Sequence, residues 1–475
     1  MVLKHNLTLR KVIGEGAYGC VHKPSIHCKS GLPINFNYDD YVSKIMKTKD
    51  AEDELKEFIV IGSYDKTDEF HLGAPIMCQP ALNSSIIEND ISKCKHIKSR
   101  DVREKPDKYK LLLLKFGGPD LKELCNNQLI KYLKTNMAKK TDLFLLEVHR
   151  LLKGLRFLKE NGLVHNDIKP QNILFNTKTG ELKYIDFGLM RKKAVIIDSS
   201  KESDNFLGIF HWSYPFECGF MNKKLFKKYS SSSDVKREEY FKQLSNLIVT
   251  KSEVNKLKLP IRHPDAFNIL FTYINPEGIA PISAAKYSYI QKFFEGFNDL
   301  IDNHNYSYSY MLNHITDSID VFGLGFTMQY ILNCFKRQNA VNLETFTRLS
   351  AFFHKMYDFN SSTREINIDT LISEYETIML ETGILVRQKK DFENNRLINR
   401  PPISKTTLAK MVKEDSSSAR SLSKALENVA KLDANVLYKN ESPNIKKTKK
   451  TKKKRCVPNK RTRRNGHFDR AKQVS

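Results

Sequence analysis

The chain has 475 residues and a mass of 55.0 kDa, and 40% of its residues are hydrophobic, which is enough to bury a sizeable core and argues against wholesale disorder. No run approaches the roughly 18 to 20 apolar residues that a membrane-spanning helix needs, and the first residues lack the apolar stretch of a secretion signal. The net charge of +25 is uneven, because residues 441–475 alone hold 14 Lys and Arg against two acidic residues.

The cysteine pattern bears on the compartment. The eight cysteines are scattered along the chain and form no Cys-x-x-Cys pair. This argues against a zinc module and against a dense disulfide framework, and it fits a reducing compartment. We therefore predict a soluble, intracellular protein.

The N-terminal part alternates short apolar runs with turns. Apolar residues at 7–13 lead into Gly-Glu-Gly-Ala-Tyr-Gly-Cys-Val at 14–21, and residues 41–46 form a second short run typical of a strand. Residues 110–121 predict a buried strand that ends at a Gly-Gly-Pro break. Residues 50–62 begin with acidic residues, which favours a helix start, and we expect one buried side made of Leu55, Phe58, Ile59 and Ile61.

The rest of the chain is mainly helical in pattern. Residues 143–161 are apolar at helical period, and Gly162 is placed to end that helix. Residues 319–332 are almost continuously apolar, which predicts a buried helix. We expect an exposed loop at 230–239 and a last amphipathic helix at 422–436.

Three polar clusters make chemical sense together. The first is Gly14-x-Gly16-x-x-Gly19-x-Val21, in which glycines allow backbone amides to approach phosphates. Alone, this pattern also occurs in ordinary hairpins, and a dinucleotide-binding site would need a helix after it, where a strand follows here. The second cluster is His-Asn-Asp-Ile-Lys-Pro-Gln-Asn at 165–172, and the third is Asp-Phe-Gly at 186–188.

In this order the clusters resemble the glycine-rich loop, catalytic loop and magnesium-binding turn of eukaryotic-type serine/threonine protein kinases. The resemblance implies an α+β, bilobal fold with a small β-rich N-lobe and a larger, mainly helical C-lobe. It also implies ATP and Mg²⁺ as cofactors, and transfer of the γ-phosphate to serine or threonine hydroxyls of protein substrates. The Tyr-x-Pro-Phe-Glu and Asp-Val-Phe-Gly variants look most similar to divergent kinases of large nucleocytoplasmic DNA viruses.

The resemblance assigns roles in the chemistry. Asp167 is the carboxylate that would accept the proton of the attacking hydroxyl, and Lys169 would place a cation near the transferred phosphate. Asn172 and Asp186 would supply oxygen ligands to magnesium.

A lysine from the third strand should hold the α- and β-phosphates. Lys44 is our choice and Lys47 the fallback. On the following helix Glu54 is the expected partner of Lys44, because Phe58 one turn later matches the apolar residue that the family stacks against Phe187 and His165. Glu57 remains a competitor.

The remaining nucleotide contacts follow from the same resemblance. Val42 and the hinge at 115–117 should face the base, although apolar positions of this kind also fit plain core packing. The other expected contacts are the lid residues Gly14, Glu15, Gly16, Ala17, Tyr18 and Gly19, the adenine-facing Val21 and Leu174, Leu114 before the deeper pocket, and Asp120 at the ribose.

Further matches and two departures lie downstream. Glu217 resembles the glutamate that closes an activation segment, Arg364 its buried partner, and Asp320 the aspartate that holds the catalytic loop. Asn166 replaces the arginine that usually precedes the catalytic aspartate, so we expect activity that does not depend on activation-loop phosphorylation. The 102 residues between Glu217 and Asp320 exceed the family's usual spacing and could dock substrates, cap the lower lobe or be passive.

We divide the chain into a kinase N-lobe (1–115), a C-lobe (116–395) with an insertion at about 218–316, a helical extension (396–440) and a disordered basic tail (441–475). The tail suits non-specific contact with nucleic acid, with nuclear import, anionic membrane or simple solubility as alternatives. We expect a monomer without a membrane span, located in the host cytoplasm, with the virion and the nucleus as alternatives. Rival functions are a pseudokinase scaffold and a nucleic-acid-binding or virion protein that acts through the tail.

Overall fold

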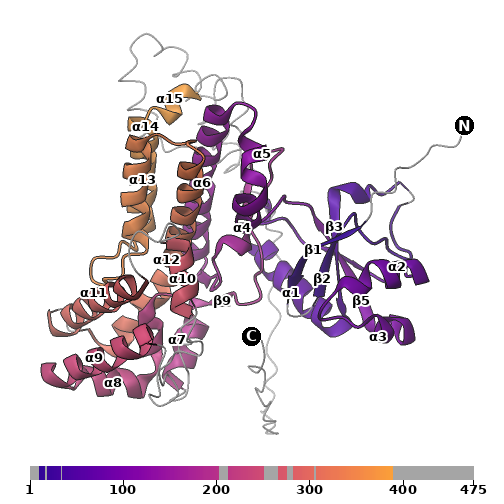
Figure 1. Cartoon of the computed structure of the whole chain (residues 1–475). Coiled ribbons are helices and arrows are strands. Elements are labelled where there is room, and N and C mark those ends of the chain that lie inside the picture. The colour runs from indigo at the N-terminus through magenta and orange to yellow at the C-terminus, as the bar shows by residue number, and fades with distance from the viewer. Residues whose placement is uncertain are drawn as a thin grey trace, which may run out of the picture.

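The structure is a computed structural model, and it describes residues 10–16, 19–33, 35–202, 212–250, 266–274, 282–303 and 306–388. Figure 1 shows two parts, a small one built on a β-sheet and a larger one built from helices. The small part comes first in the chain, as the indigo colours show, so the expected division into a β-rich N-lobe and a helical C-lobe is present.

The N-lobe sheet is antiparallel and has five strands in the order β1-β2-β3-β5-β4. Its register places Lys44 opposite Val21 on one side and Leu112 on the other, and Val42 opposite Leu114. The strands are β1 (Lys11–Gly16), β2 (Gly19–Lys23), β3 (Tyr41–Lys47), β4 (Ile76–Cys78) and β5 (Tyr109–Lys115).

Helix α1 (Thr48–Tyr64) follows β3 directly and carries Asp50 in its first turn. It buries Ala51, Phe58 and Ile61, which share one face at helical spacing. The expectation that Ile59 belongs to this face was wrong, because its side chain is 57% exposed. A residue that directly follows Phe58 in a helix is turned away from it by about 100°.

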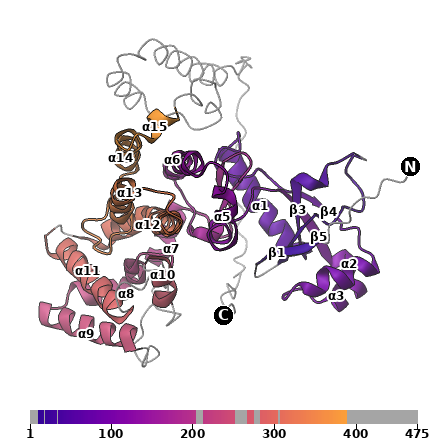
Figure 2. The same ribbon diagram turned by 45° about the horizontal axis from the view of Figure 1, so that its top comes forward.

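The opposite face of the sheet has its own cover. Figures 1 and 2 both show α1 on one side of the strands and α2 and α3 on the other. The cover is inserted between β4 and β5 and packs Ile87, Ile91 and Val102 against Leu111 and Leu113 of β5. Its elements are α2 (Ser84–Asn89), η2 (Ile91–Lys93), α3 (Ser99–Glu104) and η3 (Pro106–Lys108).

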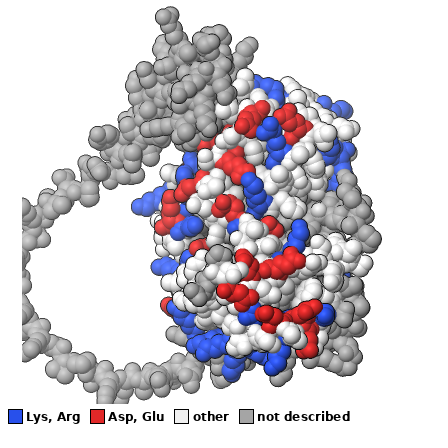
Figure 3. All heavy atoms as spheres, turned by 90° about the vertical axis from the view of Figure 1, so that its left-hand side faces the viewer, with Lys and Arg blue, Asp and Glu red and all other residues white. Residues whose placement is uncertain are grey.

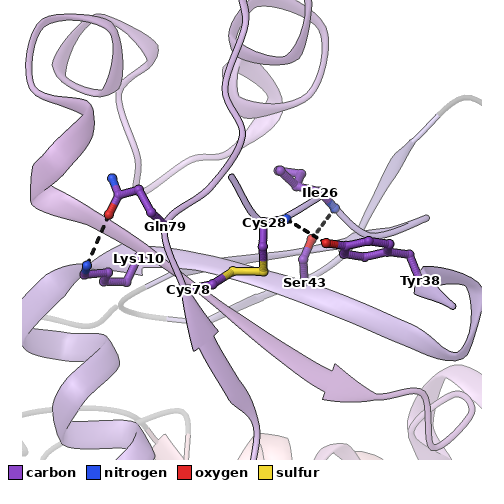
Figure 4. Close-up of a disulfide and its surroundings, with 7 residues drawn as sticks. All are labelled: Ile26, Cys28, Tyr38, Ser43, Cys78, Gln79 and Lys110. Atoms are coloured by element: carbon purple, nitrogen blue, oxygen red, sulfur yellow. Dashed lines mark hydrogen bonds between the residues drawn. A yellow bond between two sulfur atoms is a disulfide. The ribbon is translucent and has the colours of Figure 1, made fainter. Parts of the chain in front are cut away.

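Two disulfides connect residues at this outer face, which differs from the expectation of a reducing compartment that we drew from the cysteine pattern. Cys20 of β2 is bonded to Cys94 behind η2, and Cys28 is bonded to Cys78 at the end of β4. Figure 4 shows the second bond beside the hydrogen bond from Cys28 N to the Tyr38 hydroxyl. Sequence spacing could not reveal the pairs, because each joins residues at least 50 positions apart that only the sheet brings together.

The C-lobe is built around two long helices, α6 (Met137–Glu160) and α12 (Tyr308–Arg337). The apolar run at 319–332 lies in α12 and is buried, as expected. Gly162 follows α6 with a φ of +62°, a conformation that suits glycine at a helix end. The other elements up to residue 202 are α4 (Leu121–Glu123), the π-helix η4 (Leu124–Gln128), α5 (Leu129–Leu133), β6 (Leu163–Val164), η5 (Pro170–Asn172), β7 (Ile173–Phe175), β8 (Leu182–Tyr184), β9 (Arg191–Lys192) and α7 (Lys193–Glu202).

The insertion folds as helices that pack on aromatic side chains. Phe220, Phe293 and Phe297 are buried there with ring centroids 4.6 to 5.8 Å apart. The prediction of a loop at 230–239 was wrong outside residues 231–233, because Ser230 ends α8 and α9 begins at Asp234. The later elements are η6 (Phe216–Met221), α8 (Lys223–Ser230), α9 (Asp234–Thr250), α10 (Ala266–Ile274), α11 (Ile282–Asn303), α13 (Leu343–Met356), α14 (Ile368–Glu381) and α15 (Ile384–Arg387).

Charge on the described surface is mixed. The face in Figure 3 carries acidic side chains across its middle and basic ones at its lower edge, so neither sign covers it. Among the described residues, no helix is both long and apolar enough to cross a membrane. The helix expected at 422–436 and the basic tail lie outside the described residues.

Candidate active site

Helix α12 holds the loop at 165–172 in place through Asp320. The buried carboxylate of Asp320 accepts hydrogen bonds from the main-chain N–H groups of His165 (2.7 Å) and Asn166 (3.0 Å). Burial raises the pKa of Asp320 to about 7, against the effect of these two bonds. The sequence prediction that Asp320 ties down this loop is confirmed at the level of contacts.

Asp167 of the loop accepts hydrogen bonds from the side chains of Lys169 and Asn172. Lys169 Nζ lies 2.9 and 2.8 Å from the two carboxylate oxygens of Asp167. Asn172 Nδ2 donates to Asp167 Oδ2 at 2.7 Å and to its main-chain oxygen at 2.8 Å. Burial raises the pKa of Asp167, which Lys169 opposes and the charge of Asp186 reinforces. The carboxylate is therefore fixed in orientation by two donors.

Asp186 approaches this group from the strand pair β7–β8. Its φ of +64° is unusual for a residue other than glycine, and such backbone conformations concentrate at functional sites. Its charge raises the pKa values of both Asp167 and Glu57, so three carboxylates share one region. A cation would offset their mutual repulsion.

The donor set fits magnesium. Because Nδ2 of Asn172 is bonded to Asp167, its amide oxygen is the atom left to face a cation, together with the carboxylate of Asp186. Oxygen ligands of this kind are those Mg²⁺ takes in proteins. Asn172 and Asp186 would hold such an ion, and its charge would offset that of bound phosphates.

Lys44 is paired across the N-lobe. Its Nζ lies 2.5 Å from Oε2 of Glu54, and both side chains are about one-fifth exposed, at 20% and 18%. Glu57, the competing partner, lies instead beside the Asp186–Gly188 turn. A Cβ atom added to Gly188 would lie 3.4 Å from Glu57 Oε2. Burial, then the charges of Glu54 and Asp186, raise the pKa of Glu57 to about 7.

Aromatic contacts connect α1 with the catalytic loop. The Phe187 ring lies 6.1 Å from that of Phe58 and 5.0 Å from that of His165, centroid to centroid, as the resemblance implied. His165 is fully buried, and burial lowers its pKa to about 4. The imidazole is therefore neutral at physiological pH.

The expected hinge follows β5. A Cβ atom on Gly117 would lie 2.8 Å from Leu174 Cδ1 and 2.9 Å from Leu72 Cδ2, so this backbone packs directly on the residue expected under the adenine. The N–H of Phe116 is already used, because it donates to Asp40 O at 2.8 Å. The N–H of Phe116 is therefore not available to a base edge.

Asp120 has a structural task beside any ligand contact. Its Oδ1 accepts a hydrogen bond from Glu123 N at 2.8 Å and so caps α4. The main chain of Asp120 forms a β-bridge with that of Leu174. Burial raises its pKa. Only its second carboxylate oxygen is free of this cap.

The glycine-rich segment is a β1–β2 hairpin. Gly14 pairs with Val21 and Gly16 with Gly19, so a strand follows the loop as expected from the sequence. Ala17, Tyr18 and the side chain of Glu15 lie outside the described part of the chain.

The segment that includes Tyr214 and Glu217 is anchored by ion pairing. Arg364 contacts Glu217 through Nη1, and a second bond from Nη2 to Glu217 Oε2 measures 3.5 Å. Both side chains are buried, which confirms the predicted pair. The Tyr214 hydroxyl also donates to the main-chain oxygen of Asn166, which ties this segment to the catalytic loop.

One contact escaped the sequence analysis. Gln171 Nε2 donates to the hydroxyl of Tyr273 at 2.8 Å, so α10 of the insertion reaches the catalytic loop. The Tyr273 ring stacks on Trp212 at 4.9 Å between centroids. Neither residue pair shows a local pattern, because Gln171 and Tyr273 are 102 positions apart.

Comparisons with known proteins agree with this arrangement. Residues 95–216 match the family model described as the protein kinase domain. The chain is similar to a putative serine/threonine-protein kinase/receptor of Acanthamoeba polyphaga mimivirus, with 41% identity over 63 residues, 13% of this chain and 4% of that protein. It is also similar to mitogen-activated protein kinase kinase 10 of Arabidopsis thaliana, with 56% identity over 43 residues, 9% of this chain and 14% of that protein.

A third relative is cyclin-dependent kinase 17 of Caenorhabditis elegans, with 36% identity over 92 residues, 19% of this chain and 12% of that protein. The aligned parts thus span between 4% and 14% of the length of these curated relatives. The matched family model covers the segment from Lys95 to Phe216, which includes the catalytic loop and the Asp-Phe-Gly turn. Residues 95–216 of this chain therefore match the protein kinase domain.

Proposed function

We propose that this chain is an active protein kinase that transfers the γ-phosphate of ATP to serine or threonine hydroxyls of protein substrates, with Mg²⁺ as the metal. The observation that carries the proposal is the bonded group of Asp167, Lys169 and Asn172, set beside Asp186. Phosphoryl transfer depends on positioning and charge stabilisation, and these residue types serve both.

Each residue has a part in the proposed reaction. Asp167 accepts the proton of the attacking hydroxyl, and Lys169 stabilises charge on the phosphate that moves. Asn172 and Asp186 hold the metal, and Lys44, oriented by Glu54, binds the α- and β-phosphates. Lys169 and the name of the mimivirus relative, a putative serine/threonine-protein kinase/receptor, support serine and threonine as the acceptors.

The nucleotide is proposed to lie under the β1–β2 hairpin, which supplies Gly14, Glu15, Gly16, Ala17, Tyr18, Gly19 and Val21. Its base would contact Leu174 and the Lys115–Gly117 main chain, with Leu114 next to the deeper pocket. Asp120 would accept a ribose hydroxyl through the oxygen that does not cap α4.

A direct assay tests the proposal. Full-length protein is incubated with γ-labelled ATP, Mg²⁺ and a generic basic protein, and wild type is compared with Asp167→Asn and Asp186→Asn. We expect label on serine and threonine with wild type and a loss of at least about 100-fold in both variants. Nucleotide binding without transfer in wild type would favour a pseudokinase scaffold and overturn the proposal.

A further inference from the structure

The structure brings two cysteines and a histidine together on the outer face of the N-lobe sheet. Cys20 and His22 are alternate residues of β2, so their side chains point to the same face. Cys94 follows η2 in the cover and reaches this face from the other side. All three side chains are buried, and their ligand atoms lie within 4.8 Å of one another.

The spacing of these atoms matches a metal site. His22 Nε2 lies 3.8 Å from Cys94 Sγ. Zinc bonds of about 2.3 Å to sulfur and about 2.0 Å to nitrogen, at tetrahedral to trigonal angles, separate the two ligand atoms by about 3.5 to 3.7 Å, which is close to this distance. A Cys₂His set with one further position is a ligand set that zinc takes.

The surroundings favour the same conclusion. The imidazole of His22 is fully buried in an apolar cluster that includes Ile45, Ile87 and Ile91, where a polar ring without a strong partner is costly. The other ring nitrogen, Nδ1, makes no hydrogen bond within the described residues, although the main chain of Asp90 lies beside the ring. A main-chain carbonyl in that place is a common partner that orients a ligating histidine.

We propose that the reduced protein binds one Zn²⁺ through Cys20 Sγ, Cys94 Sγ and His22 Nε2. The disulfide between Cys20 and Cys94 is the oxidised state of the same donor set. A hydroperoxide converts one state into the other: the two thiolates give up two electrons and form the S–S bond. The hydroperoxide takes up these electrons and two protons from the solvent and leaves as an alcohol and water, or as two waters if it is hydrogen peroxide, and Zn²⁺ is released.

The site is separate from the proposed nucleotide site. Val21, between the two β2 ligands, points to the opposite face, where it opposes Gly14. The proposed metal therefore joins β2 to the cover behind the sheet, and the proposal does not depend on kinase activity.

Metal content is the deciding measurement. Full-length wild type is purified with a non-thiol reductant, equilibrated with Zn²⁺, dialysed and analysed by elemental mass spectrometry. We expect about one Zn²⁺ per chain, and its release together with the loss of two free thiols when hydrogen peroxide is added. Reduced wild-type protein that holds no zinc would overturn the proposal.

Variants locate the ion. His22→Gln and Cys94→Ser should weaken zinc binding by about 100-fold or more, whereas His22→Cys should retain it. The matched control is Cys28→Ser, which removes a cysteine from the neighbouring disulfide and should leave the zinc content unchanged. Zinc retained at full affinity by His22→Gln would contradict the assignment. If Cys94→Ser fails to fold, the wild-type zinc and thiol counts still decide the question.

Discussion

The side-chain amide of Asn166 donates a hydrogen bond to the main-chain oxygen of Leu189 at 3.1 Å. This bond joins the residue before Asp167 to the segment that follows the Asp186–Gly188 turn. Asn166 has a φ of +62°, a left-handed conformation that asparagine tolerates better than most residues. A neutral amide thus links the two segments where the family usually has an arginine that pairs with a phosphate.

The first prediction concerns phosphorylation. Changing Ser199, Ser200 and Ser203 together to alanine should leave kcat within about twofold of wild type, because the catalytic loop is held by neutral bonds and by Asp320. Ser200 is buried and donates to Ile196 O at 2.8 Å inside α7, and Ser203 lies outside the described residues. Steady-state kinetics on dephosphorylated wild type and the triple variant would check this, and a loss beyond about tenfold would contradict it.

The second prediction separates Glu54 from Glu57. Glu54→Gln should lower kcat/KM for ATP by about 10- to 100-fold, because Lys44 loses a charged partner. Glu57→Gln should instead change the pH dependence of stability. The folded-state pKa of Glu57 is raised to about 7, so its protonated form is favoured on folding and wild-type stability falls as pH rises from about 4.5 to 7. Denaturant titrations across this range should show a smaller fall in Glu57→Gln, and parallel curves would contradict the prediction.

The third prediction uses His165. Its pKa is about 4 in the folded state, against 6.5 for an unperturbed histidine side chain, so the unfolded chain binds more protons between these values. Stability should therefore fall as pH drops from 6.5 to 4, by roughly 3 kcal/mol from this group alone. His165→Phe keeps an aromatic ring against Phe187 and removes the titration. Between pH 6.5 and 4 the free energy of unfolding of wild type should fall by this much more than that of the variant. Equal pH dependence in the two proteins would refute the lowered pKa of His165.

The fourth prediction concerns the Arg364–Glu217 pair. Arg364→Met should lower the free energy of unfolding by about 3 to 5 kcal/mol, because it leaves the Glu217 carboxylate buried without its partner. Arg348→Met is the matched control, since its pair with Glu381 (2.7 Å) is about half exposed and should contribute less than about 1 kcal/mol. Chemical denaturation of the two variants measures the difference. Equal losses of stability in the two variants would show that the buried pair contributes no more than the exposed one.

The fifth prediction concerns the second disulfide. Cys28→Ser with Cys78→Ser should lower stability by roughly 3 to 4 kcal/mol, because the bond closes a loop of 50 residues that contains Lys44 and Glu54. The free energy of unfolding of wild type should fall by at least this much when a reductant is added, because the reductant also opens Cys20–Cys94, whereas the variant should lose less. Unchanged stability in the variant would mean that the N-lobe does not depend on this bond.

Much of the fold could be predicted because its signals are local. The strand at Tyr41–Lys47, the buried helix over 319–332 and the glycine that ends α6 each follow from neighbouring residues. The roles expected for 165–172 and 186–188 also rest on contiguous motifs. Ile59 shows the limit, because one step along a helix moves a side chain by about 100° and a pattern with several apolar residues leaves the buried face ambiguous.

The sequence alone determined the elements and the chemical groups of the candidate site, since backbone preferences and motifs act over a few residues. Tertiary structure decided which distant groups meet. The sheet and its cover bring Cys20 and His22 to Cys94, the phase of α1 turns Glu54 rather than Glu57 toward Lys44, and the insertion brings Tyr273 to Gln171. Such contacts depend on how whole elements pack to bury their apolar faces, and that packing is not written in any short stretch of residues.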